Sequence, residues 1–456
     1  TRFGVANSYL YYSPGDMDWD ATLALDPVAE RTLATRSWRD EVDRWYEDER
    51  PRVFAQNEAL QRERLDGCSD AYLAAHIERA IAHFLEVAPL HFEHSGFDIA
   101  MGLLLRATSE WEIDAADVIA LLAGASPSTA AISAQVDAIV RHRDAPPTSL
   151  ADIGAQDLSR VLDEHGWRVI DGNDLAGATL GERPELVLAA IRARMESGPS
   201  SVGGGIERVR SHVPSAQRVQ FAELLADARG LYSLRDDDNG VCFVWPLGLI
   251  RRGVLEAGRR LADRGAVRAA DDLFEATPEE ISALLVGDGP RADDLAARRA
   301  ARISARDLEP PMQLGELHED QGPALPPHVA ELDAIRNVYF AAASGRSAGQ
   351  LKGIGVGESV VRGRARRLVD DNAVARIDVG DVLIAVTTTC SLNSVFPLLA
   401  GVATEEGGLF SHTALLAREL GLPAVVGAPG LLASISDGDL VEIDAVAGVV
   451  RVIERA

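Results

Sequence analysis

The sequence contains few cysteines and almost no lysine. Its three cysteines, Cys68, Cys242 and Cys390, lie far apart and form no Cys-x-x-Cys pair, which argues against a disulfide framework or a zinc site and fits a reducing compartment. Lys352 is the single lysine among 45 basic residues. The sequence also lacks a run of about 18 apolar residues, which a membrane-spanning helix would need. It shows no basic segment leading into an apolar stretch, which a signal peptide would need. We therefore expect a soluble, cytoplasmic protein with no membrane partner.

Charge of one sign dominates the chain. The formal net charge is −25 over 456 residues, so the chain as a whole repels phosphate polymers, and no segregated basic face stands out. These features exclude nucleic acid as an expected partner. The length is sufficient for two or three domains with sizeable cores.

The pattern of apolar residues divides the chain into two regions of different fold. Residues from about 20 to 300 show helical periodicity, as in Ala71–Glu86, Glu185–Met195 and Gln217–Arg229. Prolines, glycines and small polar residues then accumulate between residues 305 and 350. We expect a multidomain protein, with a mainly α-helical N-terminal domain over residues 1–304, a linker over 305–350 and an α/β domain over 351–456.

The expected α/β domain is built from short apolar runs separated by glycine and aspartate. Such runs are typical of strands in a small α/β domain. The segment Ser411–Leu420 is the clearest helix among them. The predicted strands are Val382–Val386, Val402–Thr404, Ala424–Val426, Val441–Ile443 and Val449–Ile453.

The segment Thr404–Gly427 contains the most informative motif. Gly407 and Gly408 allow a sharp turn after the predicted strand, Ser411 is a good N-cap, and the following helix should stop at Gly421. His412 would then occupy the first helical position, where free N–H groups and the helix dipole favour a dianionic group on the imidazole. A neutral imidazole at that place can accept a phosphoryl group.

This segment resembles the phosphohistidine signature of the mobile domain of phosphoenolpyruvate-utilising enzymes. The resemblance covers residues 351–456 and implies a swivelling domain in which His412 carries the phosphoryl group. Many members have threonine where this chain has Phe410, so hydroxyl support must come from other residues. An ordinary helix-capping histidine in an inactive domain is the alternative. The residues expected to support the phosphoryl group are Thr404, Gly407, Gly408, Ser411, Thr413 and Arg418.

The family implies a donor of the phosphoryl group, which in several relatives is an ATP-grasp domain. The sequence has no glycine-rich loop with a lysine, and a bare triplet such as Gly203–Gly205 is more often a flexible loop than a phosphate cradle. We expect ATP and Mg²⁺ to act through an ATP-grasp partner, either a separate subunit or an upstream segment. We assign no metal ligand to this chain.

The helical region is expected to bind the acceptor. It resembles the mobile-subunit group related to phenylphosphate synthase and, more distantly, rifampicin phosphotransferases. Phosphoryl transfer to a hydroxyl needs a general base and positive groups. His91 and His94 share one helical face and are candidates for the base; packing histidines are the alternative, and a metal site there would need two further ligands.

Other candidates for the acceptor site lie in polar stretches of the same region. Arg168, Asp174 and Glu182 fall in a glycine-containing segment typical of binding loops, although a salt-bridged surface loop would look similar. Asp238 ends a run of three carboxylates that would act as a base, bind a cation or remain a solvated acidic loop. Arg251 follows an apolar segment and is our candidate to meet the phosphoryl group.

Together these observations predict a phosphotransferase of dikinase-like type that is incomplete without its ATP-binding partner. A phosphoryl group passes from ATP to His412, and the small domain then delivers it to a small alcohol or phenol held in the helical domain. Two alternatives remain open. One is a non-enzymatic phosphocarrier or regulatory protein, and the other is an enzyme that uses the phosphorylated alcohol as an intermediate for elimination or isomerisation.

Overall fold

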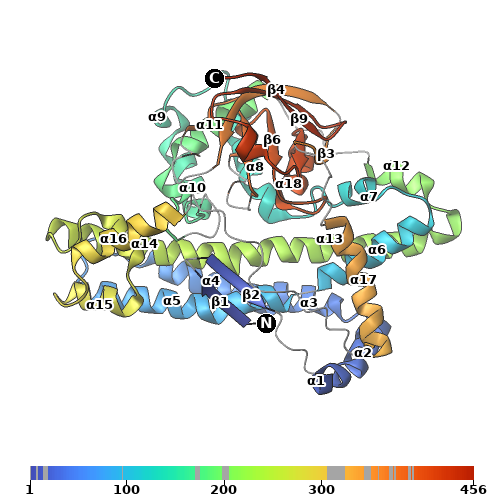
Figure 1. Cartoon of the computed structure of the whole chain (residues 1–456), viewed down its shortest axis with the longest axis horizontal. Coiled ribbons are helices and arrows are strands. Elements are labelled where there is room, and N and C mark those ends of the chain that lie inside the picture. Colours follow the sequence, from blue (N-terminus) through green and yellow to red (C-terminus); the bar gives the residue numbers. More distant parts are fainter. Residues whose placement is uncertain are drawn as a thin grey trace. The chain divides into compact units, whose positions relative to one another are not determined.

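The chain forms two compact units, each assembled from three separate segments. The first unit comprises Thr1–Ser37, Glu58–Leu85 and Leu249–Ala334, and the second comprises Trp38–Asn57, Glu86–Gly248 and Ile335–Ala456. In the described part of the chain, no helix combines the length and the apolar character that a membrane crossing needs. The computed structural model (Figure 1) describes residues 2–6, 9–13, 19–94, 96–169, 175–197, 205–305, 324–343, 351–357, 359–368, 373, 376–388, 392 and 395–456.

The first unit is helical apart from one antiparallel hairpin. Arg260 holds the turn between α4 (Arg50–Arg62) and α5 (Asp70–Glu93), because its guanidinium donates to the carbonyls of Leu65 and Cys68, both at 2.7 Å. The elements that lie wholly in this unit are β1 (Arg2–Ala6), β2 (Tyr9–Ser13), α1 (Trp19–Ala24), α2 (Asp26–Thr35), α15 (Pro278–Leu285) and α16 (Ala292–Ala305). Four longer helices have residues in both units: α4 (Arg50–Arg62), α5 (Asp70–Glu93), α14 (Trp245–Asp263) and α17 (Pro327–Ala343).

The second unit contains the remaining helices and the larger sheet. Helix α6 packs along α13 and lies close to α17, because Gly102 has no side chain: a Cβ there would come within 2.2 Å of the Ile335 carbonyl oxygen. The helices are α3 (Trp38–Arg44), α6 (Gly96–Glu110), α7 (Ala115–Ala120), α8 (Pro127–Val140), α9 (Leu150–Ile153), α10 (Ala155–His165), α11 (Glu185–Ser197), α12 (Gly205–His212), α13 (Arg218–Asp238), α18 (His412–Leu420) and α19 (Leu431–Ser434).

Seven strands form a mixed sheet in the order β3-β7-β6-β5-β4-β8-β9. Strands β4, β5, β6 and β7 are parallel neighbours, and β3, β8 and β9 pair antiparallel at the two sides. All residues of β5 and β6 are buried, as expected for central parallel strands covered on both faces. The bounds are β3 (Ile354–Val356), β4 (Val360–Arg367), β5 (Val382–Ala385), β6 (Gly401–Thr404), β7 (Ala424–Val426), β8 (Leu440–Asp444) and β9 (Val449–Glu454).

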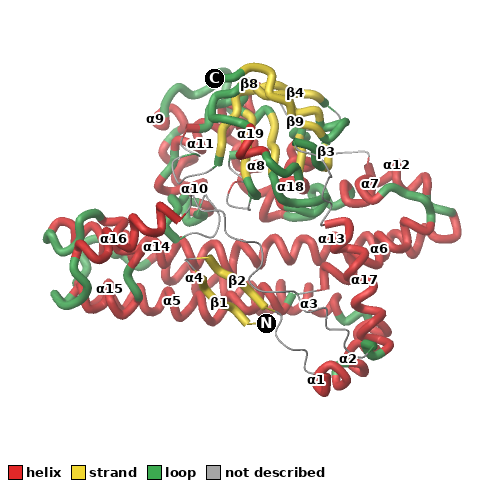
Figure 2. The backbone as a smooth tube through the Cα atoms, viewed as in Figure 1, coloured by secondary structure: helices red, strands yellow, loops and turns green. Residues whose placement is uncertain are grey.

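One apolar cluster joins the sheet to helices of the same unit. It contains Val136 of α8, Val161 of α10 and Ile191 of α11, together with Phe396 and Leu416 near the motif helix α18. Figure 2 shows the strands in yellow beside α8 and α11 in red. The motif helix is therefore held from several sides by buried side chains.

The structure confirms the predicted fold class and most predicted elements. The helices expected near residues 71, 185 and 217 are α5, α11 and α13, and the five predicted strands are β5 to β9. The β1–β2 hairpin and β4 were not predicted. The segment predicted as a linker contains α17, which is longer than the short helical piece that we expected. The domain boundaries at 304 and 350 stay a prediction.

Candidate functional site

The motif forms a turn and a capped helix at the carboxyl end of β6. Gly407 has a φ of 111°, which favours glycine, and a Cβ there would lie 2.9 Å from the Ser411 Cβ. The Ser411 hydroxyl accepts a hydrogen bond from the Ala414 backbone N–H at 3.3 Å. Helix α18 begins at His412 and ends at Gly421, which has a φ of 66°. Both ends agree with the prediction.

His412 contacts a hydroxyl relay from the neighbouring strand. Thr388 follows β5, and its Oγ1 lies 3.1 Å from His412 Nδ1 and 2.7 Å from Thr413 Oγ1. The Phe396 ring packs edge-on against the imidazole, with centroids 5.9 Å apart. The carboxyl ends of β5 and β6 thus meet at the site, as is usual for ligand sites of parallel sheets.

The imidazole of His412 is neutral in this environment. Burial lowers the pKa of His412 to about 3, so the ring carries no proton charge at pH 7. A neutral imidazole has one N–H and one lone pair. If Nδ1 donates to Thr388, the lone pair lies on Nε2, and a neutral Nε2 is the nucleophile that phosphoryl transfer needs.

The other motif residues hold the backbone around His412. Thr404 is fully buried, and its hydroxyl donates to the Glu406 carbonyl at 2.8 Å. Arg418 donates to the Leu409 carbonyl at 2.7 Å, and burial lowers the pKa of Arg418 to about 10. Gly408 accepts from the Ser411 N–H at 3.0 Å. Their described contacts therefore stabilise the loop that presents His412.

A second cluster of the same unit is centred on the buried carboxylate of Asp238. His91 Nδ1 lies 2.7 Å from Oδ1, and His94 Nδ1 lies 2.6 Å from Oδ2. His94 Nε2 in turn lies 3.0 Å from Glu49 Oε2. Asp238 has no exposed surface, and Glu49 is 8% exposed. The three predicted residues His91, His94 and Asp238 are thus brought together, and Glu49 is an additional member.

The two histidines of this cluster have different surroundings. Burial would lower the pKa of His94, but hydrogen bonds and charge from Asp238 and Glu49 outweigh it and raise that pKa. With an acceptor on each ring nitrogen, His94 is suited to be an imidazolium. His91 donates through Nδ1 to Asp238, so its Nε2 carries the lone pair, and its side chain is 22% exposed. His91 is therefore the more accessible of the two histidines.

Two π-helical segments adjoin the cluster. Glu49 ends the segment Trp45–Glu49, and Asp238 immediately precedes the segment Asn239–Val244. Asp237 anchors them, since it accepts from Trp45 Nε1 at 2.9 Å and from Arg50 Nε at 2.6 Å. Single π-helical turns inside α-helices are frequent at functional sites. No sequence pattern signalled Glu49 as a site residue, whereas Asp237 belongs to the run of three carboxylates that ends at Asp238.

Aromatic contacts join the loop of His412 to the helical part of this unit. The Phe410 ring lies 4.9 Å from Tyr339 of α17 and 6.5 Å from Phe97 of α6, centroid to centroid. All three side chains are more than 90% buried. Arg235 of α13 lies over Phe97 and donates to the Tyr339 hydroxyl at 3.2 Å. Phe410 thus packs on the helix that begins two residues after His94.

The remaining candidates lie elsewhere. Arg168 packs over the Trp167 ring at 5.2 Å, and Glu182 caps a short helix by accepting from the Thr179 N–H and hydroxyl at 3.0 Å. Asp174 lies outside the described residues. Arg251 belongs to the first unit, where its guanidinium lies 4.9 Å from the Phe274 ring centroid. The described contacts of Arg168 and Glu182 do not include a residue of the Asp238 cluster.

Within the described ranges, no three histidine, cysteine or carboxylate side chains are arranged to hold a metal ion. The carboxylates of the Asp238 cluster instead accept hydrogen bonds from ring N–H groups. These residues do not fit a Mg²⁺ site.

The chain is similar in sequence to several known proteins. The chain is 32% identical over 287 residues to an uncharacterized protein of Mycobacterium tuberculosis, covering 62% of this chain and 30% of that protein. It is 23% identical over 313 residues to an uncharacterized phosphotransferase of Bacillus subtilis, covering 66% and 37% of the two chains. It is 26% identical over 328 residues to the rifampicin phosphotransferase of Streptomyces sviceus, covering 65% and 34%.

The chain spans about a third of the length of these relatives. Residues 377–448, which contain Thr388, Thr404 and His412, match the family of the PEP-utilising enzyme mobile domain. This part of the chain therefore belongs to the mobile-domain family of the PEP-utilising enzymes.

Proposed function

We propose that this chain is the carrier and acceptor part of a phosphotransferase. His412 receives a phosphoryl group that originates from ATP, and the helical region of the second unit binds the hydroxyl compound that finally receives it. Both the similarity to phosphotransferases and the neutral His412 at the first position of α18 support this proposal. The three widely separated cysteines support a cytoplasmic setting.

The observation that carries the proposal is the packing of Phe410 between Phe97 and Tyr339. Phe410 lies two residues before His412, and Phe97 lies three residues after His94. The carrier loop and the helix beginning beside the Asp238 cluster are thus in direct contact. A carrier docked in this manner supports delivery toward that cluster.

In the first step, His412 Nε2 attacks the γ-phosphorus of ATP bound by a partner domain or subunit. The N–P bond forms as the bond from phosphorus to the ADP oxygen breaks. During this step the Thr388 hydroxyl accepts a hydrogen bond from the Nδ1–H of His412. The proton stays on Nδ1, so the lone pair that attacks phosphorus lies on Nε2. The N-terminal dipole of α18 stabilises the negative charge of the phosphoryl group.

In the second step, the acceptor hydroxyl attacks the phosphorus. His91 Nε2 takes the hydroxyl proton, the O–P bond forms, and the N–P electron pair returns to His412 Nε2. Asp238 orients His91 through its Nδ1–H and stabilises the imidazolium that forms. The acceptor is a small alcohol or phenol; partly exposed Phe243 and exposed Phe92 pack edge-on near His91 and offer it an apolar surface.

Intact-mass measurement after incubation with ATP and an ATP-grasp partner tests the proposal. Wild type should gain one acid-labile phosphoryl group, and His412→Asn should gain none. His91→Gln should keep the labelling and lose transfer to the acceptor, since it retains the fold but not the base. Labelling of His412→Asn equal to that of wild type would overturn the carrier assignment.

A further inference from the structure

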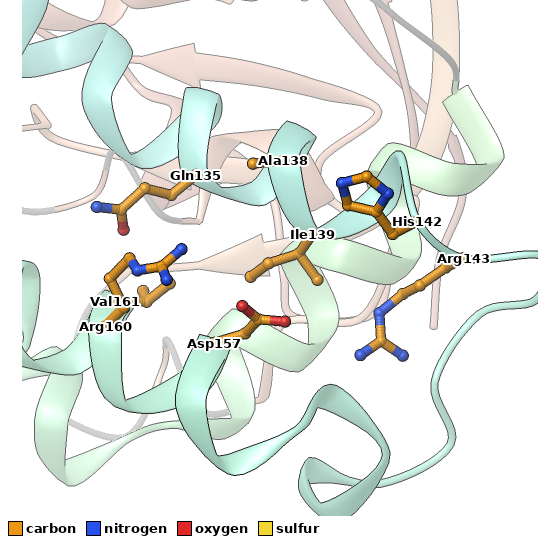
Figure 3. Close-up of a pocket in the computed structure, with 8 residues that line it drawn as sticks. All are labelled: Gln135, Ala138, Ile139, His142, Arg143, Asp157, Arg160 and Val161. Atoms are coloured by element: carbon orange, nitrogen blue, oxygen red, sulfur yellow. The ribbon is translucent and has the colours of Figure 1, made fainter.

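A pocket that contains no residue of the proposed transfer site lies between α8 and α10 of the second unit. Its volume is 380 Å³, within the usual range of small-molecule pockets. Figure 3 shows polar side chains around an apolar wall. The lining residues are Gln135, Ala138, Ile139, His142, Arg143, Asp157, Arg160 and Val161.

The charged groups of this pocket are not engaged with each other. Asp157 and Arg160 lie three residues apart on α10, a spacing at which opposite charges commonly pair. Neither has an ion-pair partner among the described residues, and both line the pocket. Arg143 donates to the Ile153 carbonyl, which holds its guanidinium at the opposite rim (Figure 3). The pocket therefore offers two positive groups around one negative group.

A buried acceptor completes the polar lining. Gln135 Nε2 donates to Glu164 Oε2, which orients the amide. Its Oε1 is buried and has no hydrogen-bond partner among the described residues. An unsatisfied buried acceptor costs about 1–3 kcal/mol, so a ligand that donates an N–H to this oxygen would be favoured.

The apolar wall of the pocket favours an apolar side chain on such a ligand. Ile139 is 7% exposed and Val161 is 1% exposed, and both belong to the apolar cluster that reaches α18. Ala138 adds a small apolar surface beside them. A branched aliphatic group would bury its surface against this wall.

We propose that this pocket binds a small zwitterion, an α-amino acid with an aliphatic side chain. Its carboxylate pairs with Arg160, because guanidinium groups match carboxylates in geometry and charge. Its ammonium donates to Asp157 and to Gln135 Oε1. Its side chain packs on Ile139. This site is separate from the residues of the proposed transfer reaction.

Calorimetric titration of the full chain with L-valine tests the proposal. Valine should bind, whereas isovalerate, which lacks the ammonium, and L-valinamide, which lacks the carboxylate, should each bind at least about tenfold more weakly. Arg160→Gln and Asp157→Asn should weaken valine binding by a similar factor. Arg141→Gln, an exposed arginine one residue before His142 and outside the pocket lining, is the matched control and should bind as wild type.

Several outcomes would overturn the proposal. Absence of heat with valine, leucine, isoleucine and alanine at millimolar concentration would do so, as would equal binding of isovalerate and valine. Unchanged affinity in a folded Arg160→Gln variant would also contradict it. Inorganic phosphate binding as tightly as valine would mean a simple anion site instead.

Discussion

The hydroxyl of Thr388 determines which nitrogen of His412 is presented for reaction. Its Oγ1 lies 3.1 Å from Nδ1 and 2.7 Å from the Thr413 hydroxyl, so the ring is held on one side by a short relay. A hydrogen bond from Nδ1–H to Thr388 places the lone pair on Nε2, although the sequence motif around His412 contains no sign of Thr388. Only the structure shows that Thr388 contacts His412, because the carboxyl ends of β5 and β6 meet there.

Thr388→Val should slow phosphorylation of His412 by roughly three- to tenfold. The change removes one hydrogen bond worth about 0.5–1.5 kcal/mol while it conserves the shape of the side chain. The rate of mass gain under single-turnover conditions measures the effect. Thr388→Ser restores the hydroxyl and should react nearly as wild type; a valine variant with the wild-type rate would show that Thr388 does not position the ring.

Asp238→Asn should abolish most transfer to the acceptor and preserve labelling of His412. An amide has one acceptor oxygen in place of two, so one of His91 and His94 loses its partner. Loss of an oriented base typically costs about 10²–10⁴-fold in rate. The pKa of His94 should also fall, because Asp238 is a main cause of its rise.

Two measurements test this variant, transfer from preloaded protein and an NMR titration of the His94 ring. Asp236→Asn is the matched control, since Asp236 accepts from Ser126 at 2.5 Å and makes no described contact with either histidine. Normal transfer by a folded Asp238→Asn variant would remove the cluster from the mechanism.

At the scale of elements, the loop before α18 is attached to α6 and α17 by one aromatic side chain. Phe410 stands where the resemblance to the family led us to expect threonine, and it is 8% exposed. Phe410, which departs from the family's sequence pattern, therefore has a packing role. Local sequence cannot reveal this role, because Phe97 and Tyr339 are distant in the chain.

Phe410→Ala should slow transfer to the acceptor and leave the first phosphorylation unchanged or faster. Loss of the buried ring weakens the contact of the carrier loop with Phe97 and Tyr339. Hydrogen exchange of the 405–411 amides should rise in the variant. Phe410→Leu keeps most of the apolar volume and should behave closer to wild type. Equal transfer by the alanine variant would mean that this docking has no role in delivery.

At the scale of the whole molecule, buried neutral histidines make the second unit sensitive to acid. His165 of α10 is 5% exposed, and neither ring nitrogen has a hydrogen-bond partner among the described residues. Burial, with a smaller effect from Arg168, lowers the pKa of His165 to about 3. The pKa of an unfolded histidine is about 6.5. Below that value the unfolded chain binds a proton that the folded unit does not.

The free energy of unfolding should therefore decrease as the pH falls from 6.5 toward 3, by up to about 1.4 kcal/mol per pH unit for this group. His165→Leu removes the group and should make the decrease shallower. Hydrogen exchange of the α10 amides at pH 7 and pH 5 measures it within the second unit. An identical pH dependence in wild type and variant would contradict the effect.

The predictable features of this protein were those that depend on neighbouring residues. Ser411 caps the helix that starts at His412, and Gly421 ends it, because caps and turns need only a few adjacent residues. The buried strands β5 and β6 were also readable as apolar runs. The β1–β2 hairpin and the two π-helical segments had no such local signal.

The sequence alone determined the carrier motif, the α/β character of the C-terminal region and the helical character of the rest. Tertiary structure decided which distant side chains share a site. His91 and Asp238 lie 147 residues apart, and His94 and Glu49 lie 45 apart. A buried carboxylate needs donors from any element that can reach it, and chain order does not encode which elements those are. Packing of α5, α13 and the π-helical segment Trp45–Glu49 makes that choice.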